Sequence, residues 1–426
     1  MAPPSHSGSK DLNSQSEQAL LIALYHSKRE KPVQESSLEE LALLADTAGV
    51  TVVASHLLEL RSIEPATYIG EGKIESLAQE IIASSIDVII FDENLSPTQY
   101  RNLEKLLNVK VMDRTGLILD IFAHRARSRE GKLQVELAQL EYILPRLSGK
   151  GTELSQLGGG IGTRGPGETK LELDRRKARA RVSFLKEQIK KVQTHRELHR
   201  QRREEITMPL VALVGYTNAG KSTLLNYLTQ SSVLAEDKLF ATLDPTARRL
   251  KLPSGREVLL VDTVGFVNKL PHQLIDSFKS TFEETASAHL LIHMIDVSHP
   301  HWIHQKKVVE DLLLDLNLHK KPTILVANKI DRLSPSDLLA LKKEEELKFI
   351  SAQTGEGVQE FLLLIDQELA RNFRWMSLLL PHTAGSDLSI LYRSGRVLKR
   401  EDRPQGIYLE VEVDQKGYNQ FKNYQL

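Results

Sequence analysis

The stretch GYTNAGKST, residues 215–223, constrains the fold of this chain more than any other feature. It fits the pattern G-x-x-x-x-G-K-[ST], follows the apolar run LVALV and precedes LLNYLTQ, which has the composition of a helix. In that setting, backbone N–H groups turn inward around a pyrophosphate, and the helix start adds partial positive charge. We therefore predict a phosphate-binding loop between a strand and a helix, in preference to a plain glycine turn.

This loop and the run LFATLDPT, residues 239–246, supply the groups that we expect to contact phosphate and metal. Lys221 is expected to reach the β and γ phosphates, and the Ser222 hydroxyl is expected to ligate Mg²⁺. Thr242 follows about twenty residues after the loop, where a switch threonine would complete the magnesium shell. Thr246 is its rival for that role.

The run VLLVDTVGF, residues 258–266, raises the question of how an attacking water would be positioned. Asp262 is expected to hold Mg²⁺ through a water, and the Gly265 N–H can approach a γ-phosphate because no side chain intervenes. Phe266 then stands where many GTP-hydrolysing domains with this kind of loop carry a water-orienting glutamine. Its ring can neither donate nor accept those bonds. We therefore predict slow hydrolysis by the domain alone, with the water positioned by backbone groups or by a residue ordered in a complex.

Two later motifs predict which base is bound. The tetrad NKID supplies Asn328, Lys329 and Asp331 after an apolar strand. The Asp331 carboxylate can accept from both N1–H and the exocyclic amine of guanine, a donor pair that adenine lacks, so discrimination is steep. The run SAQTGEG follows one strand later, where Ser351 and the Ala352 N–H are placed to contact the guanine O6.

These motifs occur in order within about 140 residues and together predict a GTP-binding domain. The expected catalytic residues are Lys221, Thr242 and Gly265. The expected ligands of Mg²⁺ are Ser222, Thr242 and Asp262. Asn218 either is a turn residue or helps to hold a K⁺ ion against the phosphates. The full set of expected nucleotide-binding residues is Gly215, Tyr216, Thr217, Asn218, Ala219, Gly220, Lys221, Ser222, Thr223, Phe240, Ala241, Thr242, Leu243, Asp244, Asp262, Thr263, Val264, Gly265, Asn328, Lys329, Ile330, Asp331, Ser351, Ala352 and Gln353.

The pattern of helices and strands predicts an α/β protein with several parts. Before the GTP-binding domain, strand-like and helix-like pieces alternate, as in ALLIALY followed by LEELALLADTAGV, which favours a small parallel sheet with covering helices. Ser96–Pro97 is typical of a helix start. The predicted parts are a disordered tail (1–17), an N-terminal α/β domain (18–113), an antiparallel helical hairpin with a glycine-rich loop (114–206), a P-loop GTPase domain (207–371) and a small C-terminal α+β appendage (372–426).

The predicted hairpin consists of helical runs over 117–147 and 171–205, separated by the glycine-rich segment 148–170. Residues 170–205 hold 13 Lys or Arg and 6 Asp or Glu, which is a net charge of +7. Such a surplus suits a phosphate backbone, although a solvated helix face is the alternative.

Composition narrows the setting. The chain has 426 residues, with 56 Lys plus Arg and 56 Asp plus Glu, so its total charge indicates no partner. It has no cysteine, which excludes disulfides, thiolate metal sites and thiol catalysis. We read no signal peptide in the first residues and no apolar run of the ~18 to 20 residues that cross a bilayer. A cytoplasmic location is therefore expected.

The chain resembles the HflX-type GTPases of the Obg–HflX group over roughly residues 18–371. The resemblance rests on GYTNAGKST, LFATLDPT, DTVGF, NKID and SAQTGEG, and more specifically on YIGEGK, DRTGLILDIFAHRARSREGKLQVELAQL and GGGIGTRGPGETKLELDRR. It implies a GTPase that binds the large ribosomal subunit and its RNA, and splits stalled or idle ribosomes under stress such as heat. It also implies a loop that reaches toward the peptidyl-transferase region, carrying Lys150, Arg164 and Lys170. We expect a monomer with no DNA partner and at most peripheral membrane contact.

Other interpretations stay open. YIGEGK is a helix start, a contact for RNA phosphate, or a site for a second nucleotide, since ATP-dependent activity has been proposed within the family. The function could instead be that of a GTP-switched ribosome assembly or surveillance factor. A second rival is an ATP-dependent RNA-remodelling enzyme that uses the N-terminal domain.

Overall fold

The computed structural model describes residues 16–60, 62–146, 170–204, 208–229, 239–240, 242, 246–270, 285–343, 346–371 and 373–426. The chain divides into two compact units. The first comprises Met1–Ile121 and Pro145–Leu157, and the second comprises Phe122–Leu144 and Gly158–Leu426. Most of the predicted tail, and the glycine-rich loop with Lys150 and Arg164, lie outside the described residues. The predicted domain limits remain predictions.

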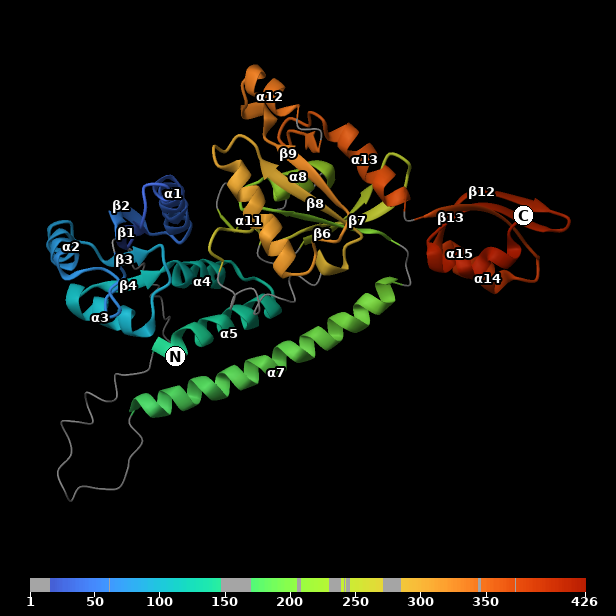
Figure 1. Ribbon diagram of the computed structural model, residues 1–426. Helices are drawn as coiled ribbons and strands as arrows, with labels where there is room; N and C mark the ends of the chain where they lie inside the picture. Colours follow the sequence, from blue (N-terminus) through green and yellow to red (C-terminus); the bar gives the residue numbers. More distant parts are fainter. Residues whose placement is uncertain are drawn as a thin grey trace, which may run out of the picture. The chain divides into compact units, whose positions relative to one another are not determined.

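Seven elements of the first unit alternate along the chain as the sequence predicts: β1 (Gln18–Tyr25), α1 (Lys31–Thr47), β2 (Thr51–Glu59), α2 (Glu71–Ala83), β3 (Val88–Phe91), α3 (Pro97–Leu107) and β4 (Lys110–Asp113). The strands form a fully parallel sheet in the order β2-β1-β3-β4 (Figure 1). Strands β1 and β3 are apolar along almost their whole length, because helices cover a parallel sheet on both faces.

Two predicted helix starts are confirmed in this unit. Ser96 Oγ accepts from the Gln99 N–H while the Gln99 side chain accepts from the Ser96 N–H, a capping box that opens α3. The run YIGEGK opens α2 with Gly70 at the cap, and the Lys73 amine donates to the carbonyl of Glu59. YIGEGK therefore has its helix-start role, and its RNA and nucleotide roles remain hypotheses.

Buried charges lie at the carboxyl end of this sheet. Arg114 is 1% exposed and pairs with Asp92 (Nη1 to Oδ1, 2.5 Å) and with Glu40. Asp113, at the end of β4, pairs with Arg146 (2.8 Å). Each buried carboxylate thus has a cationic partner, which the desolvation of an ion requires.

The helical region differs from the prediction in one respect. The sequence predicts one helix over 117–147, but the structure has α4 (Arg114–Arg125) and α5 (Arg129–Arg146). Ser128 explains the break, because its hydroxyl accepts from the Gly131 N–H and so caps the start of α5. The second predicted helix is α7 (Lys170–Glu204).

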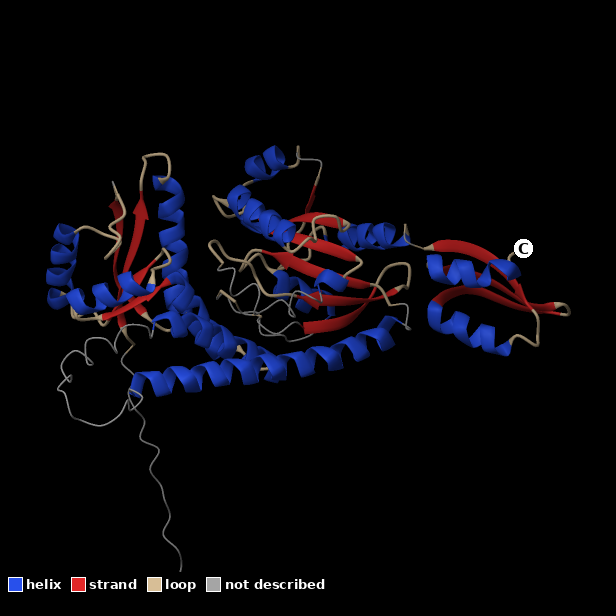
Figure 2. Ribbon diagram, turned by 60° about the horizontal axis from the view of Figure 1, so that its bottom comes forward, coloured by secondary structure: helices blue, strands red, loops and turns tan. Residues whose placement is uncertain are grey.

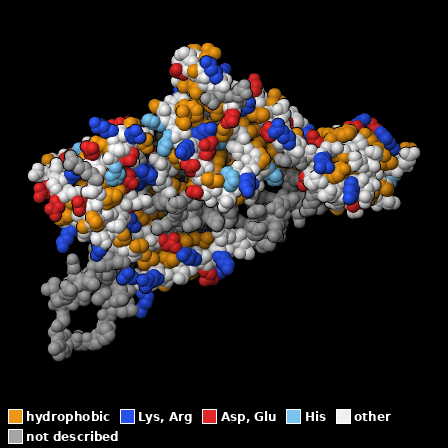
Figure 3. Space-filling view, viewed as in Figure 1, with side chains coloured by type: hydrophobic (Ala, Val, Ile, Leu, Met, Phe, Trp, Pro, Cys, Tyr) orange, Lys and Arg blue, Asp and Glu red, His pale blue; other side chains and the backbone are white. Residues whose placement is uncertain are grey.

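The predicted antiparallel hairpin is formed by α5 and α7, which run in opposite directions (Figure 1). Leu137 of α5 packs against Leu185 and Ile189 of α7. Ion pairs flank this contact, from Arg181 to Glu136 (2.6 Å) and from Lys186 to Glu141 (2.9 Å). Figure 3 shows Lys and Arg side chains along the described part of this helix pair.

The second unit contains a six-stranded sheet in the order β10-β9-β8-β5-β7-β6, parallel except for the β6–β7 pair. Its strands are β5 (Leu210–Gly215), β6 (Thr246–Lys251), β7 (Glu257–Asp262), β8 (Leu290–Asp296), β9 (Thr323–Asn328) and β10 (Leu347–Phe349). The described helices that connect or follow these strands are α8 (Lys221–Thr229), α11 (Trp302–Asp315), the short 3₁₀ turn η1 (Ile330–Arg332), α12 (Pro335–Leu341) and α13 (Val358–Ala370).

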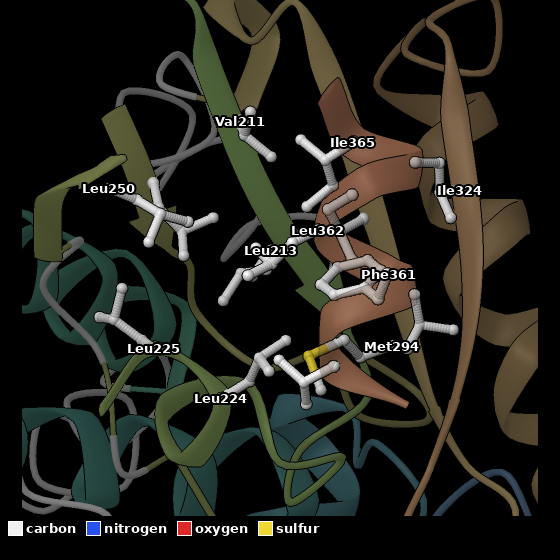
Figure 4. Packing of buried hydrophobic residues seen from close by; sticks show 14 of the residues in the cluster. Val211, Leu213, Leu224, Leu225, Leu250, Met294, Ile324, Phe361, Leu362 and Ile365 are labelled. Carbon is white, nitrogen blue, oxygen red and sulfur yellow. The ribbon is translucent and has the colours of Figure 1, made fainter. Parts of the chain in front are cut away.

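The core of this sheet fixes the edge where the motifs lie. Figure 4 shows Phe361 and Ile365 of α13 packing toward Leu213 of β5 and Met294 of β8. Parallel strands anchored in this way present their carboxyl ends at one edge, where α/β folds bind ligands.

The chain ends in a small α+β part, as predicted. Its elements are β11 (Arg374–Leu380), α14 (Gly385–Ser394), β12 (Gly395–Arg403), β13 (Gly406–Val413), α15 (Gln415–Phe421) and η2 (Lys422–Tyr424). The strands are antiparallel in the order β11-β13-β12. Figure 2 shows the strands and helices of this part next to the C-terminus. Among the described residues, no helix is long and apolar enough to cross a membrane.

The Arg114 cluster generates a stability prediction. Arg114→Met leaves Asp92 buried without its guanidinium, so the free energy of opening β1 and β3 should fall by about 3 kcal/mol. Hydrogen exchange of the backbone amides of β1 and β3 measures this free energy. Arg181→Met removes an exposed pair instead, and should leave the protection of α5 unchanged. Wild-type protection of β1 and β3 in Arg114→Met would contradict the prediction.

Candidate nucleotide-binding site

The predicted strand–loop–helix is confirmed for GYTNAGKST. β5 ends at Gly215, and α8 begins at Lys221. The backbone between them turns through positive φ at Asn218 (60°) and Gly220 (93°). A Cβ on Gly220 would lie 2.2 Å from Asn328 Nδ2, so only glycine fits between the loop and β9.

Lys221 is buried at the base of this loop. Its Nζ donates to the carbonyls of Gly215 (3.1 Å) and Tyr216 (2.8 Å), and the residue is 6% exposed. Burial lowers the pKa of Lys221 to about 8, while the nearby Asp262 acts in the opposite direction. A bound phosphate would restore the charged form of this amine.

Three predicted metal ligands converge beside it. Ser222 Oγ donates to Asp262 Oδ2 (2.6 Å), Thr242 Oγ1 donates to the same oxygen (2.8 Å), and the two hydroxyls lie 2.9 Å apart. The rival, Thr246, is the first residue of β6 and lies opposite Asp262 in the β6–β7 strand pair. The hydroxyl that converges on Asp262 Oδ2 is that of Thr242, which favours Thr242 over Thr246.

The cluster fits a hard divalent cation. Asp262 is fully buried, and its Oδ1 has no hydrogen-bond partner among the described residues. Burial raises the pKa of Asp262, while Lys221 and the hydroxyls of Ser222 and Thr242 lower it. A cation bound to these oxygens would favour the carboxylate, and oxygen ligands are those that Mg²⁺ prefers.

Gly265 and Phe266 lie directly against the phosphate loop. A Cβ on Gly265 would lie 2.8 Å from Thr217 Cγ2 and 3.1 Å from Lys221 Nζ, so this backbone reaches the loop only as glycine. The Thr217 N–H donates to the Phe266 carbonyl (2.7 Å), and the Phe266 N–H donates to the Gly215 carbonyl (3.2 Å). With its ring 1% exposed, Phe266 braces the loop and does not replace a water-orienting side chain.

The base-recognition motifs are brought together, with one difference. Asn328 Nδ2 donates to the Ala219 carbonyl (2.8 Å), and Asn328 Oδ1 accepts from the Ala352 N–H (2.9 Å). The Ala352 N–H, predicted to contact guanine O6, is thus engaged by Asn328 in this structure. Asp331 is exposed, and its Oδ1 accepts from Ser351 Oγ (2.6 Å), which orients the carboxylate.

Several predicted residues have other contacts or cannot be placed. Thr263 Oγ1 donates to the Leu213 carbonyl (2.6 Å), so this side chain serves the sheet. Ala241, Leu243 and Asp244 lie outside the described residues. Among the other described positions, Thr223 lies in α8 and Ile330 in the short helix η1, while Val264 and Gln353 lie in the loops after β7 and β10.

Sequence reasoning missed one residue at this edge. Asp296, the last residue of β8, pairs with Lys329 (2.7 Å), whose φ is 66°. The ion pair holds the NKID turn. The sequence feature that could have revealed Asp296 is an acidic residue at the end of an apolar strand, LLIHMID.

The buried lysine generates a pH prediction. Below its pKa of about 8 the Lys221 amine is protonated, and a bound phosphate favours that form, so binding above this pH must take up a proton. GDP affinity is therefore expected to fall as pH rises from about 7 to 9, by at most tenfold per unit. Calorimetry across this range measures the slope. Lys221→Arg should flatten it because a guanidinium stays protonated. A wild-type affinity that rises with pH would contradict the prediction.

Comparisons with known families agree with this geometry. Three family models match, described as GTP-binding GTPase N-terminal (residues 35–123), GTP-binding GTPase Middle Region (125–203) and 50S ribosome-binding GTPase (210–329). Together they cover β2, β3 and β4 of the first unit's sheet, most of the helical region and most of the nucleotide site.

Relatives match over nearly the whole chain. A GTPase HflX from Caldanaerobacter subterraneus subsp. tengcongensis is 48% identical over 404 residues, which is 95% of this chain and 92% of the relative. A GTPase HflX from Escherichia coli K12 is 43% identical over 381 residues, which is 88% of each chain. These matches, with the phosphate loop and the guanine motifs, identify a GTP hydrolase. The chain therefore belongs to the HflX family of GTPases.

Proposed function

We propose that this chain binds the large ribosomal subunit and splits or recycles stalled or idle ribosomes under stress such as heat, with GTP hydrolysis timing its engagement. The observation that carries this proposal is the charge of residues 170–205, the segment that contains α7. It has a net charge of +7 and belongs to the same compact unit as the nucleotide site. The family model named for 50S ribosome binding supports the choice of partner.

The surface of α7 suits an RNA backbone. Arg181 and Lys186 are paired within the hairpin, whereas Lys177, Arg179 and Lys190 are exposed. Exposed cations that neutralise phosphates release counterions, and this release drives salt-sensitive binding. Phe184 is also exposed, with the Arg181 guanidinium 5.2 Å from its ring centroid, an arrangement on which a base can stack.

The nucleotide site supports hydrolysis through positioning and charge. Lys221 faces the phosphates from the loop, and the guanine is held by Asp331 and Ser351. Ser222, Thr242 and Asp262 would hold Mg²⁺, the last through a water, and the ion supplies positive charge against the phosphates. A water oxygen then bonds to the γ-phosphorus as the bond to the β–γ bridging oxygen breaks, giving GDP and phosphate.

The position of Phe266 leaves the water without a side-chain guide from this segment. We propose that backbone groups, or a residue ordered on the ribosome, position the water, so the ribosome stimulates turnover. Asn218, exposed and at φ 60°, either shapes the turn or holds K⁺. Equal turnover in Na⁺ and K⁺ would exclude the ion.

Base selection is tested by Asp331→Asn. The amide cannot accept from both guanine donors, so GTP affinity should fall by about 10²-fold or more. Xanthine carries an oxygen where guanine carries the exocyclic amine, and the amide introduced by the substitution can donate to that oxygen. Xanthosine triphosphate should therefore gain affinity in the variant. Unchanged discrimination between GTP and xanthosine triphosphate would contradict this role of Asp331.

Ribosome splitting is tested on sucrose gradients. Intact 70S-type ribosomes and separate subunits are incubated with the protein and GTP, GDP or a non-hydrolysable GTP analogue. The proposal predicts co-sedimentation with the large subunit and conversion of 70S particles to subunits with GTP or the analogue.

Charge-reversal variants make this test specific. Lys177→Glu with Arg179→Glu and Lys190→Glu should abolish binding and splitting. The matched control, Lys342→Glu with Lys343→Glu on exposed positions at the end of α12, should behave like wild type. Binding without separation would favour the assembly or surveillance role. Absence of the protein from every ribosomal fraction would overturn the proposal.

A further inference from the structure

Phe240, two residues before Thr242 in the switch segment, has an unusual backbone conformation. Its φ is +56°, in the left-handed region that non-glycine residues rarely adopt, and its ring is 2% exposed. A strained backbone of this kind persists only where its surroundings fix it. The contact that buries the Phe240 ring therefore bears directly on where Thr242 lies.

That contact comes from the helical region. Phe122, in the last turn of α4, is also 2% exposed, and its ring meets the Phe240 ring edge to face, with centroids 4.6 Å apart and planes at 83°. This is a favoured geometry for an aromatic pair. Phe122 begins the segment Phe122–Leu144, which belongs to the same compact unit as the GTPase sheet.

Two residues beyond Phe240, the Thr242 hydroxyl lies within hydrogen-bonding distance of Ser222 Oγ (2.9 Å) and Asp262 Oδ2 (2.8 Å). The span between the ring anchor and the metal cluster is too short to absorb a large displacement. Movement of the Phe240 ring away from Phe122 would therefore carry Thr242 away from the cluster.

We propose that Phe122 is a positioning residue for hydrolysis, acting through Phe240 to place Thr242 against the Mg²⁺ site. The proposal rests on the proposed role of Thr242 as a metal ligand. It gives the first helical run of the predicted hairpin a task in the nucleotide site, which is to set the γ-phosphate-dependent metal shell. A partner that shifts Phe122 would thereby alter the metal affinity of the GTP state.

The test uses binding as well as turnover. A switch threonine ligates the metal in the triphosphate state and is released after hydrolysis. For the full chain, we measure the affinity for a non-hydrolysable GTP analogue and for GDP, each with saturating Mg²⁺ and with chelator. The ratio of the two affinities for each nucleotide is its Mg²⁺-dependent gain.

Phe122→Leu should lower the gain for the analogue about fivefold or more, within the usual range of coupling between sites, and leave the gain for GDP unchanged. Phe361→Leu, in the core under α13, is the matched control: it should lower the melting temperature without altering either gain. Phe240→Leu removes the same pair from the switch side, so it gives the result even if Phe122→Leu fails to fold.

The double variant Phe122→Leu with Phe240→Leu should be no worse than Phe240→Leu alone, because both changes break one contact. Additive losses, or a wild-type analogue gain in Phe122→Leu, would overturn the proposal. An absence of any Mg²⁺-dependent gain in wild type would overturn the assignment of Thr242 and this proposal together. Failure to bind or split ribosomes would instead overturn the proposed function and leave these gains as predicted.

Discussion

The burial of two opposite charges, Lys221 and Asp262, is the constraint on which the rest of the nucleotide site depends. Desolvation lowers the pKa of the amine to about 8 and raises that of the carboxyl, so each group is held in an unfavourable environment. Each charge lies near the other, and among the described residues their hydrogen-bond partners are neutral: carbonyls of Gly215 and Tyr216 for the lysine, and the hydroxyls of Ser222 and Thr242 for the aspartate. A polyphosphate and a divalent cation supply the charges that these partners lack. Ligand binding therefore offsets the cost of burying the charges of Lys221 and Asp262.

The order of the strands brings the parts of this site to one place. β5, β7 and β9 end at the same edge of a parallel sheet and deliver the phosphate loop, Asp262 and Asn328. Asn328 then joins the loop to the segment after β10, so that the phosphate and base regions form one connected network. Phe266 closes the network from the opposite side through its main chain. Phe266, which stands where other GTPases carry a catalytic glutamine, therefore helps to fix the shape of the phosphate loop.

Much of this architecture follows from the sequence because it depends on local patterns. The glycine spacing of the phosphate loop, the apolar strands before Asp262 and Asn328, and the cap at Ser96 each reflect the conformation of a few adjacent residues. The features that escaped prediction depend on distant partners. Nothing near Ala352 reveals that its N–H meets Asn328, and nothing near Phe240 reveals Phe122. The break between α4 and α5 was visible in principle, since Ser128 is a cap residue, but the apolar helical spacing continues across it.

Proton uptake during nucleotide binding tests the central claim most directly, because it reports the buried lysine itself. Titration of the full chain with the GTP analogue and Mg²⁺, at pH 8 to match the lowered pKa of Lys221, is repeated in buffers of different ionisation enthalpy. The account predicts one nucleotide per chain and a fractional proton taken up, which disappears in Lys221→Arg. Binding without proton uptake, or no heat of binding at all, would contradict it.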